Sequence, residues 1–187
     1  MKNIVIIGRP RAGKSTLANM ISDKYHYQII RTDTIRNTFR EIMPELNIRP
    51  RTAIESKEFQ MFCKEFMEAN IRQARNKYGY VMEGCEIFVK DCKELYDNGN
   101  NLIYVLAQKN IKPEQMAKNI KKHDMVNDWS YEMSDEERIE YCEKQIEKAK
   151  IWEQECKIYG LKFYDTSKDR DKVLNEIMED IEKNIKE

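Results

Sequence analysis

The sequence Gly8-Arg9-Pro10-Arg11-Ala12-Gly13-Lys14-Ser15-Thr16 decides how this chain is organised. It matches the pattern G-x-x-x-x-G-K-[ST], follows the apolar run Ile4–Ile7 and precedes the amphipathic segment Leu17–Ile21. That context predicts a phosphate-binding loop between a buried strand and a helix. The two glycines permit backbone angles and close approaches that a side chain would block. Successive N–H groups and the helix N-terminus can therefore surround a chain of phosphates.

Two side chains of the loop indicate a metal-bound nucleoside triphosphate. We expect Lys14 to reach the outer phosphates and Ser15 to ligate Mg²⁺, while the whole loop from Gly8 to Thr16 binds the nucleotide. A chance match in an ordinary strand–turn–helix is the alternative, and it would need the strand, both glycines, lysine, serine and helix to coincide in register. The motif predicts the nucleotide but not its use.

The composition favours one domain, residues 1–187, because 41% of the 187 residues are hydrophobic and can form one substantial core. The sequence contains no run of the roughly 18–20 apolar residues that a membrane span needs. Its five cysteines form no C-x-x-C pair, which is typical of free thiols in a reducing compartment. We therefore expect a cytoplasmic protein without a membrane partner.

The charges are balanced overall but unevenly distributed. Residues 1–80 carry a net +7 and residues 81–187 a net −7, and nine of the eleven arginines precede Tyr78. The planar guanidinium suits phosphate and carboxylate groups, so an anionic ligand on this side is one interpretation. Solvated helix faces are the other. The neutral total argues against a nucleic-acid partner.

Five short apolar segments alternate with helical patterns along the chain. This alternation predicts an α/β fold, a three-layer doubly wound parallel five-stranded sheet. Ligands of such sheets bind at the carboxyl ends of the strands. We expect strands at Asn3–Ile7, Tyr27–Arg31, Tyr80–Met82, Asn101–Leu106 and Leu161–Tyr164. Helices are expected at Lys14–Tyr25, Asp33–Met43, Thr52–Tyr78, Val89–Tyr96, Pro113–Lys122 and Ser134–Tyr159, followed by a last helix capped by Thr166 or Ser167.

Two details of these helices are specific enough to check. Asp33 or Thr32 is expected near the cap of its helix. In the helix expected over Thr52–Tyr78, Phe59, Phe62 and Phe66 recur at helical spacing, which predicts that all three lie on the core face.

The chain resembles the small P-loop kinases, the relatives of adenylate, shikimate and gluconate kinase, including a branch described only as ATP-binding or AAA-type. The resemblance covers the whole chain in architecture. In motif it rests on the Gly8–Thr16 loop, on Asp33-x-x-Arg36 after the second strand and on Glu83-Gly84 after the third. The first motif is specific for the superfamily, the second is moderately specific for acceptor-type kinases, and the third is common. The resemblance implies ATP and Mg²⁺ as cofactors.

The same resemblance implies roles for three side chains beyond the loop. Asp33 would accept the acceptor's hydroxyl proton or hold Mg²⁺ waters, or it would only cap a helix. Arg36 would bind an anionic group of the acceptor, or it would be a surface charge. Glu83 would coordinate Mg²⁺ through water, or it would only tether the strand end.

Two regions would complete such an enzyme. Residues 34–78 would bind the acceptor, and residues 113–140 would form a lid around the irregular polar segment His123–Met133. Lys118, Lys122 and Arg138 would bring positive charge from the lid to the phosphates, and Thr166 and Ser167 would border the adenine. The chain lacks an adenylate-kinase lid with paired arginines and a Gly-Gly-Gly loop after the third strand. These departures argue against nucleoside monophosphates and shikimate as acceptors.

Three functions stay open from the sequence. The first is an ATP-dependent kinase of a small, anionic, hydroxyl- or phosphate-bearing metabolite. The second is a nucleic-acid 5′-end kinase, and the third is a nucleotide-binding regulatory protein or slow NTPase. Asp33-x-x-Arg36 favours a kinase, because a switch has no need of an acceptor base. The absence of Asn-Lys-x-Asp argues against guanine.

Overall fold

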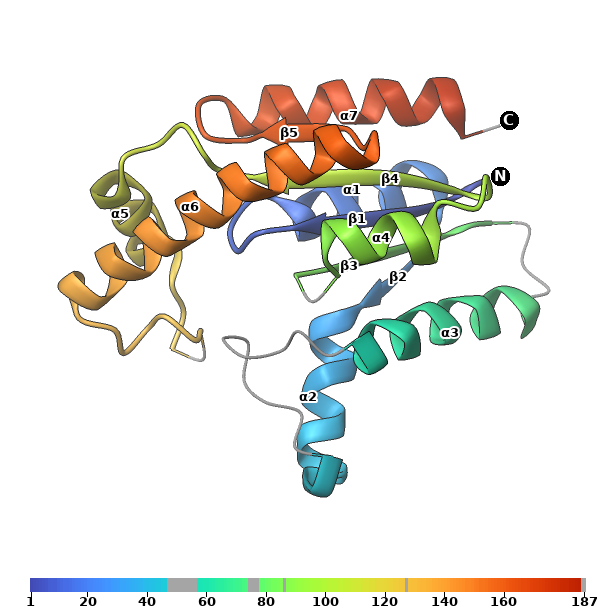
Figure 1. Cartoon of the computed structure of the whole chain (residues 1–187), viewed down its shortest axis with the longest axis horizontal. Helices are drawn as coiled ribbons and strands as arrows, with labels where there is room; N and C mark the ends of the chain where they lie inside the picture. The colour runs from blue at the N-terminus through green and yellow to red at the C-terminus, as the bar shows by residue number, and fades with distance from the viewer. Residues whose placement is uncertain (47–56, 74–77, 86, 127, 186–187) are drawn as a thin grey trace.

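A single parallel sheet forms the centre of the molecule. The computed structural model describes residues 1–46, 57–73, 78–85, 87–126 and 128–185 (Figure 1). Its sheet has the strand order β2-β3-β1-β4-β5, and every neighbouring pair is parallel. The strands are β1 (Asn3–Gly8), β2 (Gln28–Arg31), β3 (Tyr80–Gly84), β4 (Asn101–Ala107) and β5 (Phe163–Asp165).

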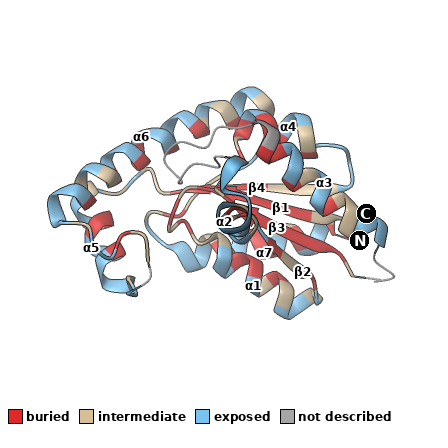
Figure 2. Ribbon diagram, turned by 90° about the horizontal axis from the view of Figure 1, so that it is seen from below, coloured by how far each residue is buried: buried red, intermediate tan, exposed pale blue. Residues whose placement is uncertain are grey.

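Helices cover both faces of this sheet, as Figure 2 shows. One face packs against α1 (Lys14–Tyr25) and α7 (Arg170–Asn184), and the other against α3 (Lys57–Gln73), α4 (Val89–Tyr96) and α6 (Asp135–Tyr159). The three-layer doubly wound fold is therefore confirmed. The remaining elements are α2 (Thr32–Ile42), the short 3₁₀ helix Pro44–Leu46 and α5 (Pro113–His123).

The central strand β1 explains why both layers are needed. Ile4 to Ile7 are fully buried, and alternate side chains enter opposite cores. Val5 and Ile7 pack towards α3, α4 and α6, whereas Ile4 and Ile6 pack towards α1 and α7. A strand apolar on both faces is stable only between two layers of helices.

The α5 helix and the first half of α6 extend beyond the carboxyl edge of the sheet (Figure 1). They form a small apolar cluster of their own, which includes Met116, Ile120 and Cys142. In the described residues, no helix has the length and apolar character needed to cross a membrane.

The helix ends follow the sequence closely, with one correction. The α6 helix begins at its N-cap Ser134 as predicted, with a capping box: the Ser134 hydroxyl accepts from the Glu137 N–H at 3.1 Å, and Glu137 accepts from the Ser134 N–H. The cap of α7, however, is Asp169, whose carboxylate accepts from the Lys172 N–H at 3.0 Å. Thr166 and Ser167 do not cap this helix, because their hydroxyls donate instead to the Ala107 carbonyl and to Asp165.

The core face of α3 also differs from the expectation. The structure describes helix from Lys57 to Gln73; residues 52–56 and 74–77 of the predicted helix lie outside the described residues. Phe59 is buried as predicted, but Phe62 is 37% and Phe66 39% exposed. Cys63 and Met67 occupy the sheet-facing positions, since they follow Phe59 at four-residue spacing.

The two exposed phenylalanines pack on each other with ring centroids 6.1 Å apart. Phe62 also meets Phe39 of α2 edge to face, with the ring centroids 4.8 Å apart. Phe62 therefore packs between α3 and α2, and not against the sheet.

A matched pair of substitutions on α3 tests this assignment. Met67→Ala should lower the free energy of unfolding by about 2–5 kcal/mol, because it opens a cavity in a closed core. Phe66→Ala should cost less than about 2 kcal/mol, because the side chain is already 39% exposed. Urea unfolding followed by circular dichroism measures both values. A larger loss for Phe66→Ala would contradict the assigned face.

Candidate functional site

The phosphate loop lies where β1 ends between β3 and β4. A Cβ at Gly8 would lie 2.3 Å from the Leu106 carbonyl oxygen of β4, so only glycine fits there. Gly13 has φ +96° and begins α1, again a conformation that favours glycine. Arg11 has φ +62°, which costs a residue with a side chain on the order of 1–3 kcal/mol. The loop's shape is thus imposed by its neighbours.

The loop opens onto a cavity of about 610 Å³, within the range of small-molecule sites. Four parts of the chain line it: the loop with the start of α1, Gln108 after β4, one face of α5, and the turn between β5 and α7 with the start of α7. Lys14 lies in this lining and donates to the Arg9 carbonyl at 3.1 Å, so its ammonium group is held over the loop. The predicted nucleotide residues Thr166 and Ser167 line the same cavity.

Ser15 and Glu83 meet at the edge of the sheet. The parallel register places Ile6 beside Glu83, which brings the end of β3 close to the loop. The Ser15 hydroxyl donates to Glu83 Oε1 at 2.9 Å, and Arg31 lies 3.6 Å from the same oxygen. Glu83 is only 6% exposed. The Ser15 hydroxyl and Arg31 together hold its carboxylate.

This pair fits Mg²⁺. A hydroxyl and a carboxylate are hard oxygen donors, and Mg²⁺ is usually held by one or two protein groups plus phosphate oxygens and water. Within the part of the chain that the structure describes, no three His, Cys, Asp or Glu side chains gather into a complete metal site. Ser15 and Glu83 would therefore hold the metal only together with bound phosphates.

Asp33 and Arg36 form a second group at the same edge. Arg36 is 3% exposed and lies 3.2 Å from Asp33 Oδ1, so it is not a solvated surface charge. The cap position of α2 is Arg31, whose side chain makes no capping hydrogen bond, and Thr32 and Asp33 follow it in the first turn, near the cap as expected. The Cys85 thiol donates weakly to Asp33 Oδ1 at 3.8 Å.

The close contact between the end of β3 and the start of α2 fixes the position of Asp33 and Arg36. A Cβ at Gly84 would lie 1.7 Å from the Thr32 hydroxyl, so the end of β3 touches the start of α2. Glycine after Glu83 is therefore needed for this contact. It places the first turn of α2, with Asp33, next to the strand end that carries Glu83.

The three predicted lid cations lie outside the cavity lining. Arg138 is 3% exposed; it donates to the Ser130 carbonyl at 2.9 Å and to Asp135 at 3.0 Å, and it lies 3.7 Å from Asp124. The α5 helix presents Asn119 and His123 to the cavity, whereas Lys118 and Lys122 are exposed and do not line it.

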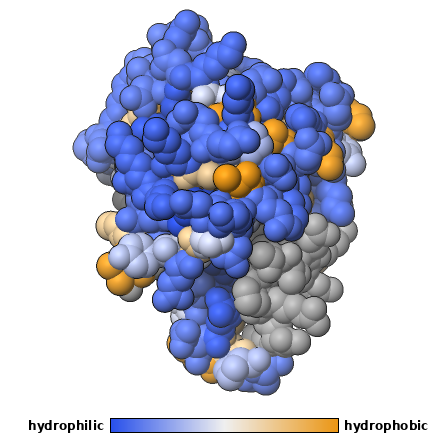
Figure 3. All heavy atoms as spheres, turned by 90° about the vertical axis from the view of Figure 1, so that its left-hand side faces the viewer, coloured by the Kyte–Doolittle hydropathy of each residue, from blue (hydrophilic) through white to orange (hydrophobic). Residues whose placement is uncertain are grey.

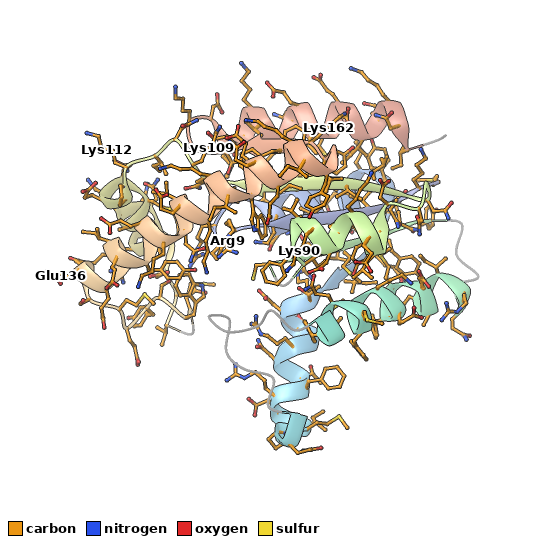
Figure 4. The ribbon with its side chains drawn as sticks, in the orientation of Figure 1. Arg9, Lys90, Lys109, Lys112, Glu136 and Lys162 are labelled. Atoms are coloured by element: carbon orange, nitrogen blue, oxygen red, sulfur yellow. The ribbon has the colours of Figure 1, made fainter. Side chains whose placement is uncertain are left out.

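Sequence reasoning missed the partners of the two loop arginines. Arg9 lies against α6 (Figure 4), where its Nε donates to Gln145 at 2.9 Å and its guanidinium lies 5.1 Å from the Trp152 ring centre. Arg11 donates to Asp124 and to Asp128, both at 2.8 Å. One feature of the sequence indicates a partner for Arg9. Gln145 and Trp152 are two helical turns apart, so they lie on one face of α6.

Comparisons with known proteins agree with this geometry. No protein-family model matches the chain. It is 29% identical over 87 residues to "Adenylate kinase 1" of a Nostoc species, an alignment that covers 45% of this chain and 47% of that protein. The chain thus spans about half the length of the curated relative it matches.

Solved structures match over nearly the whole chain. Shikimate kinase from Bacteroides thetaiotaomicron has a TM-score of 0.57 at 14% identity, covering 97% of this chain and 99% of that one. An uncharacterised protein from Eubacterium ventriosum has a TM-score of 0.56 at 12% identity over the same shares. The chain has a small P-loop kinase-like fold. The fold class and the resemblance predicted from the sequence are therefore confirmed.

Proposed function

We propose that this protein is an ATP-dependent kinase that moves the γ-phosphate of MgATP to a small, anionic metabolite. The observation that carries the proposal is that Lys14 and the Ser15–Glu83 pair share one edge of the sheet with the Asp33–Arg36 pair. Phosphoryl transfer needs charge neutralisation and in-line positioning rather than covalent chemistry. These two groups would supply a donor side and an acceptor side. The similarity to an adenylate kinase and the fold of a shikimate kinase support a kinase.

On the donor side, the loop's N–H groups and Lys14 would hold the β- and γ-phosphates. Bound Mg²⁺, held by Ser15 and Glu83, would neutralise the charge that develops on the transferred group. The turn carrying Thr166 and Ser167 borders the cavity at the far end from β3, where it would contact the base.

On the acceptor side, Asp33 would take the proton of the attacking hydroxyl, and buried Arg36, 3.2 Å from Asp33 Oδ1, would hold that carboxylate in place. The acceptor region proposed over residues 34–78 is described only in part, and Arg49, Arg51 and Arg75 lie outside the described residues. Arg36 and the exposed Arg40 are the described arginines of α2. They favour an acceptor with a negative group.

The first prediction concerns Lys14. Lys14→Ala should lower phosphoryl transfer by about 10²–10³-fold, by analogy with the loss of one preorganised charge-stabilising donor. The measurement incubates the purified protein with ATP, Mg²⁺ and a cell-extract metabolite pool, and mass spectrometry identifies new phosphorylated species. The variant should keep the wild-type circular dichroism spectrum. If a folded Lys14→Ala protein forms as much product as the wild type, Lys14 has no role in the transfer.

The second prediction separates the roles of Asp33. Asp33→Asn should bind MgATP as the wild type does but transfer phosphate about 10²–10⁴-fold more slowly, because an amide cannot accept a proton. ATP titration measures the binding and the transfer assay measures the rate. Asn keeps the shape of the side chain. Unchanged transfer by this variant would show that Asp33 is not the base.

We also propose that residues 113–140 form a lid over the nucleotide. The outer face of this end of the molecule is mostly hydrophilic (Figure 3). In the present arrangement Arg138 is engaged by Ser130, Asp135 and Asp124. Closure would have to bring Arg138, Lys118 and Lys122 nearer to the phosphates, where they would also help exclude water.

Trp129 offers a probe of lid closure. Its ring lies 4.5 Å from that of Tyr141 on α6, and Trp152 is the second of the two tryptophans. In a Trp152→Phe background, a non-hydrolysable ATP analogue with Mg²⁺ should change the Trp129 fluorescence and slow proteolysis within residues 113–140. If saturating analogue changes neither signal, the segment does not close.

A further inference from the structure

The loop residue Arg11 is held in an unusual way. Its backbone is left-handed, with φ +62°, and its carbonyl accepts from the Gln108 amide at 3.1 Å. Its guanidinium is bound by two carboxylates from the turn after α5, those of Asp124 and Asp128. A strained conformation fixed from both sides is a feature of functional sites. The loop's phosphate binding through its N–H groups needs none of these side-chain contacts.

The two loop arginines differ in what they face. Arg9 lies against Gln145 and Trp152 of α6 and does not line the cavity. Arg11 lines the cavity together with Lys14 and Ser15. Neither of its aspartate partners lines that cavity, so the carboxylates hold Arg11 from outside the site.

The ion cluster around Arg11 is incompletely hydrogen bonded. The Asp124 side chain is 4% exposed and contacts Arg11, Ser130 and Arg138. Even so, three buried atoms of the cluster have no hydrogen-bond partner among the residues that the structure describes: Arg11 Nε, Asp124 Oδ2 and Arg138 Nε. Each buried polar atom without a hydrogen-bond partner in a native structure calls for an explanation, such as strain, a catalytic role, or a bound water or ion.

We propose that the Arg11 side chain contacts the triphosphate as a second cation beside Lys14, and that Asp124 and Asp128 are positioning residues that hold its guanidinium at the cavity. The inference rests on the proposed nucleotide site and adds a side-chain contact to it. It also links the loop to the proposed lid, because Asp124 joins Arg11 to Arg138.

The proposal predicts the direction in which the affinity for ATP changes when Asp128 is replaced. Asp128→Asn removes a negative charge near a multiply charged anion, so simple charge balance predicts tighter ATP binding. Positioning predicts the opposite, because the guanidinium loses one of its two anchors. Asp128 is the better choice for this test, since Asp124 is bound to the buried Arg138 and to Ser130, whereas Asp128 also accepts from the Met125 N–H at 3.0 Å.

The experiment measures the Kd of MgATP by calorimetry for Arg11→Gly, Asp128→Asn and the double variant. Arg11→Gly suits the left-handed backbone and should bind MgATP about 10- to 100-fold more weakly, as expected for a lost charge-assisted hydrogen bond. Asp128→Asn alone should weaken binding several-fold. In the Arg11→Gly background it should have no further effect, because it acts through Arg11. Lys144→Gln, an exposed charge on α6, is the matched control and should leave the Kd unchanged.

Each of four results would overturn the proposal. A wild-type Kd for a folded Arg11→Gly variant would exclude the contact. Tighter binding by Asp128→Asn, or equal losses with and without Arg11, would exclude the positioning role. If the wild type binds ATP but transfers no phosphate, the proposed kinase activity fails and this inference stands; if it binds no ATP, both fail.

Discussion

The pairing of β1 with both β3 and β4 is the constraint on which the rest of the structure depends. It brings Gly8 against the Leu106 carbonyl, which excludes any side chain at the start of the loop. It also places Ile6 beside Glu83, so the third strand delivers its carboxylate to the first residues of α1. The site is therefore a consequence of strand register. Its rigidity comes from a strand buried on both faces, not from the loop itself.

Two buried arginines lie on α2 and α6, outside the cavity lining. Arg36 and Arg138 are each 3% exposed, and a buried guanidinium is costly unless it is paired. Each has an aspartate partner from its own helix, Asp33 or Asp135. Helices that carry such pairs beyond the edge of the sheet can present charge to a ligand while the sheet stays fixed. Under the proposed function, this arrangement would let one rigid edge serve both a donor and an acceptor.

The sequence predicts the local parts of this structure well. The bounds of α1 and α4 agree with the prediction because each element has clear local start and stop signals. The loop motif likewise identifies Lys14 and Ser15 without any tertiary information. The choice of core face on α3 fails, because aromatic residues at helical spacing satisfy either a sheet or a neighbouring helix.

Long-range ion pairs could not be predicted. Arg11 and Asp124 are 113 residues apart, and their contact depends on how the turn after α5 folds back on the loop. Arg138 was expected at the phosphates for its charge and place in the chain, yet its contacts are with Asp124, Ser130 and Asp135. Charge and spacing identify such residues, but only the fold decides which carboxylate is nearest.

The central claim is that this edge of the sheet is a site for MgATP. Calorimetric titration of ATP into the wild-type protein, with Mg²⁺ and again with EDTA, tests it most directly. The account predicts saturable binding of one ATP per chain that is clearly tighter with Mg²⁺, because the metal would join Ser15 and Glu83 to the phosphates. An absence of saturable binding, or identical isotherms with and without the metal, would contradict it.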